Sequence, residues 1–543
     1  MFRKVNETTD YNAFNLFANY DKKIKRHELS LMGGLNIEES LYEQERMERD
    51  GVISADYPSI SQATGVPVAL DNYSDYAVLG VFGRANYSFS GKYLLGLTGR
   101  YDASSRFPEG HRSGLFPSVS AGWVLTREKF LSRLPVWMNE IKLRASYGAV
   151  GNQAIPEYAF YPAMDAVYAD WLVGGAQVTT LTPPGLVSSN FTWATVQTLD
   201  FGIDLGLFKN RLTASVDWYQ RDTKDMLYEG VQLPAILGTG APLQNVAALQ
   251  TKGFEVELSW RDKIGALGYR VGVNLFDSRG RIKSIKNEAG LLSQYYVDQE
   301  LGEIWGFTTD RLYTVDDFVE GSLSDNLTGG QLKEGIPRRE GQLPNPGDIL
   351  FMDYDGNGIV NAGNNTLSDP GDRRVIGNST PRYRYNVNAG FNFKGFDLSF
   401  VINGVVKAQQ WRANQLTFPN LYNFGALYSD QLNYWMPGNE TAFHARIYDQ
   451  SAGNQSFNQS VQTRYLQNGA FLRMKNVTLA YSLPDALIRK IALERVQTFI
   501  SIENAFTLDR LPSGLDPEIN RSGDQGFGYP FLRLYSIGFN VSF

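Results

Sequence analysis

Long stretches of this chain alternate apolar and polar residues with a period of two. Between residues 197 and 208, Leu199 and Phe201 share one face, whereas Asp200 and Asp204 share the other. This pattern predicts β-strands with one apolar face. We count about 14–16 candidate strands. They lie near residues 10–22, 27–37, 77–90, 92–102, 116–126, 140–150, 196–208, 210–222, 251–262, 268–281, 383–394, 396–405, 468–482, 495–506 and 530–543, with weaker alternation near 157–168 and 300–314.

The predicted strands are long for a soluble protein. They run for about 10–12 residues, against about 5–6 in an ordinary sheet. At about 3.3 Å per residue and a tilt near 40°, this length crosses the roughly 25 Å apolar band of a bacterial outer-membrane barrel. A soluble sandwich would give the same alternation with its apolar face inward, so strand length and aromatic placement favour the barrel. The aromatic residues near predicted strand ends are Trp218, Tyr219, Trp260, Tyr383, Tyr481 and Tyr535.

The connections between the predicted strands are of two kinds. Some are turns of a few residues, such as Lys394-Gly395, whereas the segments at about 282–380 and 404–467 are long and rich in Gly, Asn, Asp and Pro. Short turns at one end and long loops at the other are typical of a transmembrane barrel, with the turns in the periplasm and the loops outside the cell. One short helix is predicted inside a turn at 484–493, because the segment opens with a proline.

The C-terminal strand gives the clearest single signal. Every second residue from Tyr535 onward is apolar, and the residues between are small or polar. A final strand that ends on an aromatic residue is what an outer-membrane barrel presents to the assembly machinery. Only closed barrels satisfy every backbone hydrogen bond of a sheet in lipid, so we predict an all-β transmembrane antiparallel barrel. The predicted barrel-assembly signal comprises Tyr535, Ile537, Phe539, Val541 and Phe543.

The composition of the chain and its missing motifs exclude several classes of function. The chain has 543 residues, 13% of them aromatic, no cysteine, three histidines and a formal net charge of −6. The absence of cysteine excludes disulfides and thiolate metal sites, and the mild charge predicts no nucleic-acid partner. We find no run of about 18 apolar residues that would predict a transmembrane helix and no signal peptide. We also find no nucleophile elbow, His-Glu-x-x-His or phosphate-binding loop, so we predict that the protein is not an enzyme.

Seven segments spread over nearly the whole chain carry a family resemblance. Each is weak alone, but together and in this order they are specific. They are Gly91–Phe107, Phe116–Trp123, Ile141–Gln153, Gly206–Thr213, Asp372–Asn378, Leu472–Leu479 and Gly514–Asn520. On these segments the chain resembles the C-terminal part of a SusC/RagA-type TonB-dependent outer-membrane transporter of Bacteroidetes.

The resemblance implies a barrel of 22 strands, of which residues 1–543 form the C-terminal 14–16 as one domain. It also implies an N-terminal extension, a TonB box and a plug, and we recognise none of them in this sequence. We therefore expect the chain to begin partway through a longer protein. The implied function is active import of an oligosaccharide or a peptide across the outer membrane. The implied partners are TonB, a SusD-like surface lipoprotein, membrane lipid and the barrel-assembly machinery.

Two other functions remain open from the sequence. A passive porin-like channel is favoured if the native protein has no plug. A β-rich surface protein that binds glycans is favoured if the alternating apolar faces pack against each other.

One loop motif points to a metal ion. The stretch from Asp353 to Asn361 places side-chain oxygens and a central Gly358 in the order of a calcium-binding loop. Position 12 holds Asn364 in place of the usual glutamate, so Asp369 or Asp372 would have to supply the last carboxylate. We expect no required cofactor, and a structural calcium ion is one interpretation; an Asp/Gly-rich turn without an ion is the other. The predicted ligands are Asp353, Asp355, Asn357, Ile359, Asn361 and Asp372.

Two sets of side chains are candidates for contact with a solute. Acidic residues fall on the polar faces of predicted strands. There they either form a charged lumen that contacts a plug or a substrate, or only keep the barrel interior hydrated. Tryptophans lie in or near loop-like stretches, where their faces could stack on sugar rings or pack within the loops. The acidic residues are Asp200, Asp204, Asp217, Glu255 and Glu257, and the tryptophans are Trp171, Trp193, Trp305, Trp411 and Trp435.

Overall fold

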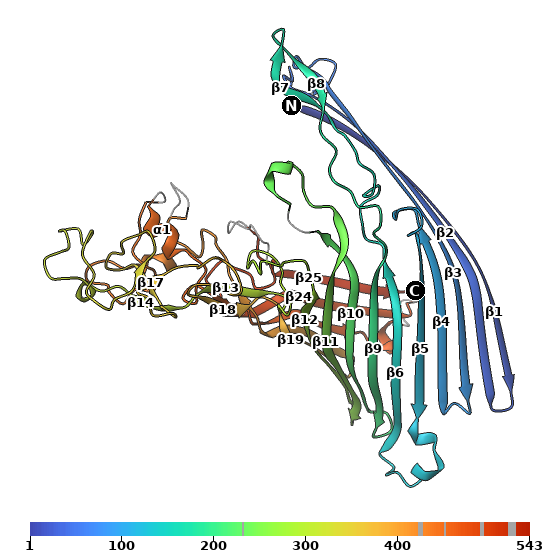
Figure 1. Cartoon of the computed structure of the whole chain (residues 1–543). Coiled ribbons are helices and arrows are strands. Elements are labelled where there is room, and N and C mark those ends of the chain that lie inside the picture. Colours follow the sequence, from blue (N-terminus) through green and yellow to red (C-terminus); the bar gives the residue numbers. More distant parts are fainter. Residues whose placement is uncertain (231–232, 422–426, 450–451, 489–492, 520–527) are drawn as a thin grey trace.

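Fifteen antiparallel strands form one large curved sheet, in which each strand pairs with the next along the chain (Figure 1). The computed structural model describes residues 1–230, 233–421, 427–449, 452–488, 493–519 and 528–543. This up-and-down order is that of a barrel wall. The strands are β1 (Phe2–Ile24), β2 (His27–Arg49), β3 (Val68–Phe89), β4 (Tyr93–Ser104), β5 (Ser113–Val124), β6 (Met138–Asn152), β9 (Ala194–Leu207), β10 (Leu212–Glu229), β11 (Leu243–Ile264), β12 (Leu267–Ser284), β19 (Arg382–Phe393), β20 (Phe396–Lys407), β23 (Phe471–Ser482), β24 (Arg495–Leu508) and β25 (Leu534–Ser542).

The strongly alternating segments of the sequence are confirmed as the strands of this sheet. The two weakly alternating segments are wrong as wall strands. The first overlaps β7 (Ala166–Val173), which forms a separate hairpin with β8 (Ala176–Leu181), and the second contains β13 (Glu303–Phe307) and β14 (Thr309–Leu312), which pair within a loop. The predicted helix is present as α2 (Asp485–Ile488), and residues 489–492 lie outside the described part of the chain.

The sheet keeps its apolar face outward. Phe201 and Trp218 pair directly across β9 and β10, Leu258 lies on the same face of β11, and each of the three exposes more than a third of its surface. No second sheet packs against this face in the part of the chain that the structure describes. The alternative of a β-rich surface protein that binds glycans required such packing, which the described residues do not show. The polar residues that alternate with these apolar ones lie on the inner face.

Short turns close one end of the sheet. Lys394 and Gly395 both have positive φ, at 47° and 88°, which is the geometry of a type I′ hairpin turn and explains the tight β19–β20 connection. Aromatic side chains follow this short-turn end across neighbouring strands, as an interfacial girdle requires. Their ring contacts join His27 to Phe89, Phe89 to Tyr93, Tyr93 to Trp123, Trp137 to Phe208, Phe208 to Trp260, and Phe396 to Tyr481. Tyr219 differs from the prediction, because the register with Gly253 places it on the inner face.

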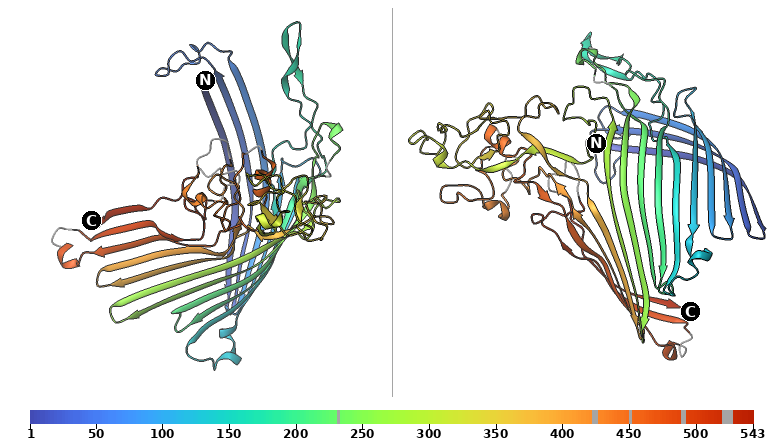
Figure 2. Two further views of the ribbon diagram at one scale, coloured as in Figure 1. Left: turned by 90° about the vertical axis from the view of Figure 1, so that its left-hand side faces the viewer. Right: turned by 60° about the horizontal axis from the view of Figure 1, so that its bottom comes forward.

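Several strands are longer than predicted. β1 and β2 each have 23 residues and β3 has 22, so they continue well beyond a bilayer at the long-loop end (Figures 1 and 2). The unbroken apolar run on one face of β2 ends at Ile37, and beyond it glutamates interrupt Leu41 and Met47, whereas the pairing with β1 runs on to Arg49. Backbone pairing thus outlasts the apolar pattern, which is why the alternation underestimated the strands.

The two longest connections fold together into one loop domain, which projects from the sheet (Figure 1). Phe307 exchanges backbone hydrogen bonds with residues 461 and 463, and its ring stacks on Phe351 at 4.9 Å. A hydrophobic core draws on both connections, with Phe418, Trp435 and Tyr465 from the second. The remaining elements here are β15 (Arg338–Arg339), β16 (Ile349–Phe351), β17 (Ile359–Val360), β18 (Arg373–Asn378), β21 (Gln409–Gln410), β22 (Gln467–Asn468), α1 (Gly453–Asn458) and two short 3-10 helices, η4 (Val315–Asp317) and η5 (Ser429–Leu432).

The described helices are all too short and polar to cross a membrane. The sheet has two edges, β1 and β25, which pair on one side only within the described residues (Figure 2).

Candidate functional site

An ion cluster lies on the inner face of the sheet, where β6, β9 and β10 run side by side. Arg144 Nε and Nη2 donate to the two carboxylate oxygens of Asp204, both at 2.9 Å. The same Nη2 donates to Asp217 at 3.0 Å and to Ser215 Oγ at 3.0 Å. Lys142 Nζ lies 3.4 Å from Asp204. A single guanidinium therefore joins three strands of the wall through a bidentate, charge-assisted contact.

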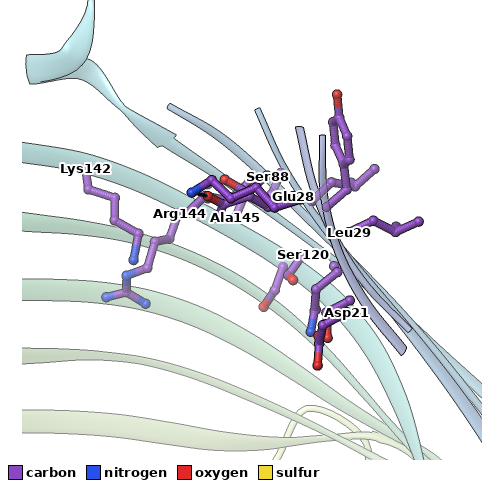
Figure 3. A pocket seen from close by; sticks show the side chains of 18 of the residues that line it. Asp21, Glu28, Leu29, Ser88, Ser120, Lys142, Arg144 and Ala145 are labelled. Atoms are coloured by element: carbon purple, nitrogen blue, oxygen red, sulfur yellow. Dashed lines mark hydrogen bonds and ion pairs between the residues drawn. The ribbon is translucent and has the colours of Figure 1, made fainter. Parts of the chain in front are cut away.

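A cavity of about 750 Å³ opens beside this cluster (Figure 3). Lys142 and Arg144 extend side by side from β6 toward it, and Ser88 and Ser120 line it from β3 and β5. Asp21 approaches from β1. The lining thus offers hydroxyl, cationic and carboxylate groups, which can replace water around a polar solute.

The acidic residues singled out in the sequence share the inner face. Asp200, Asp204 and Asp217 belong to adjacent strands, and Glu255 pairs directly with Asp217 across β10 and β11. Glu257 lies two residues along the same face. This register confirms that the five acidic residues lie on one polar face of the sheet, and their contact with a solute stays a prediction. Arg144 is not among the residues predicted from the sequence, although its place on the polar side of a predicted strand would have marked it.

A buried polar network ties the two long connections of the loop domain together. Arg339 is 1% exposed, and its Nη2 donates to the backbone oxygen of Ile349 at 2.9 Å and to Asn458 Oδ1 at 2.8 Å. Asn458 in turn donates to Asp348 at 2.8 Å. The Arg339 guanidinium lies 3.6 Å from the centre of the Phe457 ring. Burial lowers the pKa of Arg339 to about 10, so the side chain keeps its charge at neutral pH.

The five candidate tryptophans fall into different environments. Trp193 and Trp435 are buried in hydrophobic cores, so their ring faces are covered by protein. Trp411 packs against the core of the loop domain, and Trp305 donates to the hydroxyl oxygen of Tyr296. Only Trp171, on the projecting β7–β8 hairpin, exposes more than half of its surface, at 58%. Of the five, Trp171 is the one best placed for contact with a solute or a partner.

The predicted calcium ligands are partly brought together. Asp353, Asp355 and Asp372 each offer a carboxylate oxygen, and these oxygens lie within 4.8 Å of one another. Asp372 is fully buried and reaches the loop from beyond the motif, accepting from the backbone nitrogens of Tyr354 at 2.7 Å and Asn361 at 2.9 Å. Of the two carboxylates beyond the motif that were candidates, Asp372 is thus the one that lies beside Asp353 and Asp355.

The remaining predicted ligands are engaged within the loop. Asn357 Oδ1 accepts from the backbone nitrogen of Ile359 at 2.7 Å, and Asn361 Oδ1 accepts from that of Gly363 at 2.8 Å. Asp369 accepts from Asn364 at 2.7 Å, so it stabilises the next turn. The carboxylates can hold a cation, and the two asparagines would have to turn to join them.

The C-terminal strand β25 forms as predicted. It pairs with β24 from Glu503↔Leu534 to Arg495↔Ser542. Ile537 and Phe539 project from its apolar side and are largely exposed, and Phe543 follows the last paired residue.

Comparison with known proteins gives consistent matches over the whole chain. The family model described as "TonB dependent receptor-like, beta-barrel" matches residues 3–505. TonB-dependent receptor P3 of Formosa agariphila is 28% identical over 570 residues, which cover 100% of this chain and 53% of that protein. TonB-dependent receptor SusC of Bacteroides thetaiotaomicron is 24% identical over 559 residues, covering 98% and 50%. The chain thus spans about half the length of these curated relatives.

Solved structures show the same fold. The RagAB peptide importer in its "closed-closed" state aligns with a TM-score of 0.79 at 21% identity, covering 100% of this chain and 56% of that one. A structure of the RagAB peptide transporter aligns with a TM-score of 0.76 at 20% identity, with the same coverage.

Proposed function

The chain belongs to the TonB-dependent receptor family of outer-membrane β-barrels, and from this premise we propose that it forms the transport wall of an active nutrient importer. The observation that carries the proposal is the family match over residues 3–505, on a sheet that is apolar outside and charged inside. The family consists of transporters, and the predicted absence of enzymatic function agrees with this.

The cargo that we propose is an oligosaccharide, with a peptide as the second candidate. The SusC/RagA resemblance supports both classes, and the cavity beside Arg144 offers hydroxyl and charged groups to a polar solute. Trp171 adds an exposed ring on the long-loop side, where an arriving sugar could stack.

The partners that we propose are TonB and a SusD-like surface lipoprotein, as the resemblance implies. The loop domain and the projecting β7–β8 hairpin form the surface available to such a lipoprotein (Figure 1). We also propose that further strands join β1 to β25 to give a barrel of 22 strands with a plug, because unpaired strand edges are costly in lipid.

Uptake by living cells tests the proposal. A strain that lacks the gene should lose uptake of the cognate fluorescent oligosaccharide, and plasmid-borne wild-type gene should restore it. A protonophore should abolish the restored uptake, since TonB transmits inner-membrane energy. Uptake of labelled peptides alone would assign the second cargo class. Uptake that persists with the protonophore, together with an open conductance in planar bilayers, would support the passive channel and contradict the importer.

We propose in addition that the carboxylates of Asp353, Asp355 and Asp372 hold a structural calcium ion. The support is their convergence from two parts of a loop, because Ca²⁺ requires six to eight oxygen ligands. Such an ion would stiffen the loop domain and take no part in transport chemistry.

A further inference from the structure

A patch of basic side chains lies on the outer face of the sheet, directly above the apolar band. The outward positions of β11 read Trp260, Leu258, Val256 and Phe254 and then change to Lys252. On β12 the outward face changes from apolar to charged residues at the positions that pair with this part of β11. The basic patch comprises Lys252, Arg279, Arg281, Lys283 and Arg382, which together with Trp218 and Phe254 line a cavity of about 400 Å³.

The height of the patch matches the edge of a bilayer. Trp260 belongs to the aromatic girdle at the short-turn end, and Lys252 lies eight positions away on the same strand. At about 3.3 Å per residue and a tilt near 40°, this separation is about 20 Å, close to the roughly 25 Å apolar band of an outer-membrane barrel. The patch therefore lies at the level of the headgroups on the cell-surface side, with Trp218 and Phe254 among the acyl chains.

Several cations of the patch lie close enough to repel one another. Lys252 lies directly opposite Arg279 in the β11–β12 register, and like charges in such a pair destabilise a sheet. Arg281 and Lys283 follow Arg279 on the same face of β12. An anion between the two strands would offset this repulsion.

The neighbouring carboxylates leave part of this charge unbalanced. Asp277 is bound by both Nε and Nη2 of Arg382, and Asp298 lies 3.1 Å from Lys283. Glu300 is shared among Arg279 at 4.0 Å, Arg281 at 3.9 Å and Arg382 at 3.7 Å. The side chains of the two arginines of β12 remain 56% and 51% exposed. These three carboxylates thus contact four of the five cations, and a fourth carboxylate, Asp222, lies on the same outward face of β10 beside Gln250.

We propose that this basic patch binds the phosphorylated headgroup of a glycolipid in the outer leaflet of the membrane. A phosphate between Lys252 and Arg279 would relieve their repulsion, and Arg281 can reach the same headgroup from the next outward position. The acyl chains would lie over Trp218 and Phe254. Basic side chains next to an apolar membrane surface favour anionic lipids in this way. A second cavity of about 420 Å³ shares Arg279 and Arg382 and extends the groove toward Lys407.

The test uses the full chain purified in detergent and fluorescent diphosphorylated lipid A as the probe. Wild-type protein should bind it, and the triple variant Lys252→Ala/Arg279→Ala/Arg281→Ala should bind at least about tenfold more weakly. The matched control, Arg84→Ala/Arg270→Ala/Arg384→Ala, removes three cations from the inner face of the same sheet and should bind like wild type. Altered mobility on heating in SDS verifies that each variant is folded.

Competition identifies the chemical group that is bound. Unlabelled diphosphorylated lipid A should displace the probe, whereas the dephosphorylated lipid and inorganic phosphate should not. Displacement by inorganic phosphate would assign the patch to a soluble anion and overturn the proposal. Equal binding by the outer and inner triple variants would overturn it as well. If the outer triple variant does not fold, Arg279→Gln alone should still weaken binding, and unchanged binding by that variant would contradict the proposal.

Discussion

Arg473 of β23 holds Asp516 of the last long connection at 2.7 Å, and both side chains are almost completely buried. Arg473 Nε also donates to Thr507 on the neighbouring strand at 2.8 Å, so one guanidinium joins two wall strands to a loop. Both residues belong to segments that carry the family resemblance. Their contact joins these two segments in space, because one supplies the cation on the wall and the other the carboxylate in the loop.

Replacing Arg473 with methionine should release this loop. The substitution leaves the buried Asp516 carboxylate without its cation, which costs about 3–5 kcal/mol in comparable sites. We expect a lower midpoint temperature of unfolding, measured by heat-modified mobility in SDS, and faster cleavage of the connection by trypsin. The double variant with Asp516→Asn should recover part of the loss. A double variant no more stable than Arg473→Met would show that the two side chains do not act as a pair.

The same contact predicts sensitivity to acid. Burial raises the pKa of Asp516, but hydrogen bonds from the backbone of Glu518, from Arg473 and from the backbone of Phe531 outweigh burial and leave the pKa below its usual value. A carboxyl with a lowered pKa stabilises the fold above its unfolded pKa of about 3.9, and the stabilisation is lost as pH falls through the folded value. Asp516→Asn should therefore melt below wild type at pH 6, and the difference should shrink below about pH 4. A difference that does not change between pH 6 and pH 3 would contradict this assignment.

The inner-wall cluster predicts a second stability effect. Arg144→Met leaves Asp204 and Asp217 facing each other without their shared cation. Since water reaches this face, we expect a moderate loss of about 1–3 kcal/mol in the free energy of unfolding. Arg84→Met is the matched control, because Arg84 also lies on the inner face and has a single weak hydrogen bond, to Asn86 at 3.3 Å. Equal effects of the two variants would show that the cluster contributes nothing specific.

If the protein binds calcium as proposed, its affinity for Ca²⁺ should depend on particular carboxylates of the loop. Wild-type protein titrated with Ca²⁺ in a calorimeter should bind one ion, and Asp355→Asn should weaken binding at least about tenfold because a charged ligand is lost. Asp369→Asn is the control, since Asp369 stabilises the adjacent turn through Asn364. Loss of binding in Asp369→Asn but not in Asp355→Asn would place the ion elsewhere in the loop.

The sequence predicted the wall better than the loops, for a physical reason. A strand in a bilayer must present apolar residues at every second position, so the alternation located each wall strand. The regular signal ends at residues such as Ile37, where the unbroken apolar run stops although the pairing with β1 continues. The loop domain depends instead on contacts such as Arg339 with Asn458, 119 residues apart, which no local pattern encodes. Arg144 shows the same limit, because its role appears only when three strands lie side by side.

The exposed end of β25 predicts an assembly defect. Phe543 is 92% exposed and lies just beyond the last paired residue, so it contributes little to the stability of the fold. Removing it should leave the solubilised protein as resistant to heat as wild type. If the terminal aromatic residue is read by the assembly machinery, deletion should reduce the folded protein in the outer membrane several-fold, measured by heat-modified mobility on immunoblots. Tyr529→Ala is the control, because Tyr529 is a similarly exposed aromatic residue that precedes the strand. An equal reduction in both variants would indicate a general effect of surface aromatics, and normal assembly without Phe543 would refute the signal.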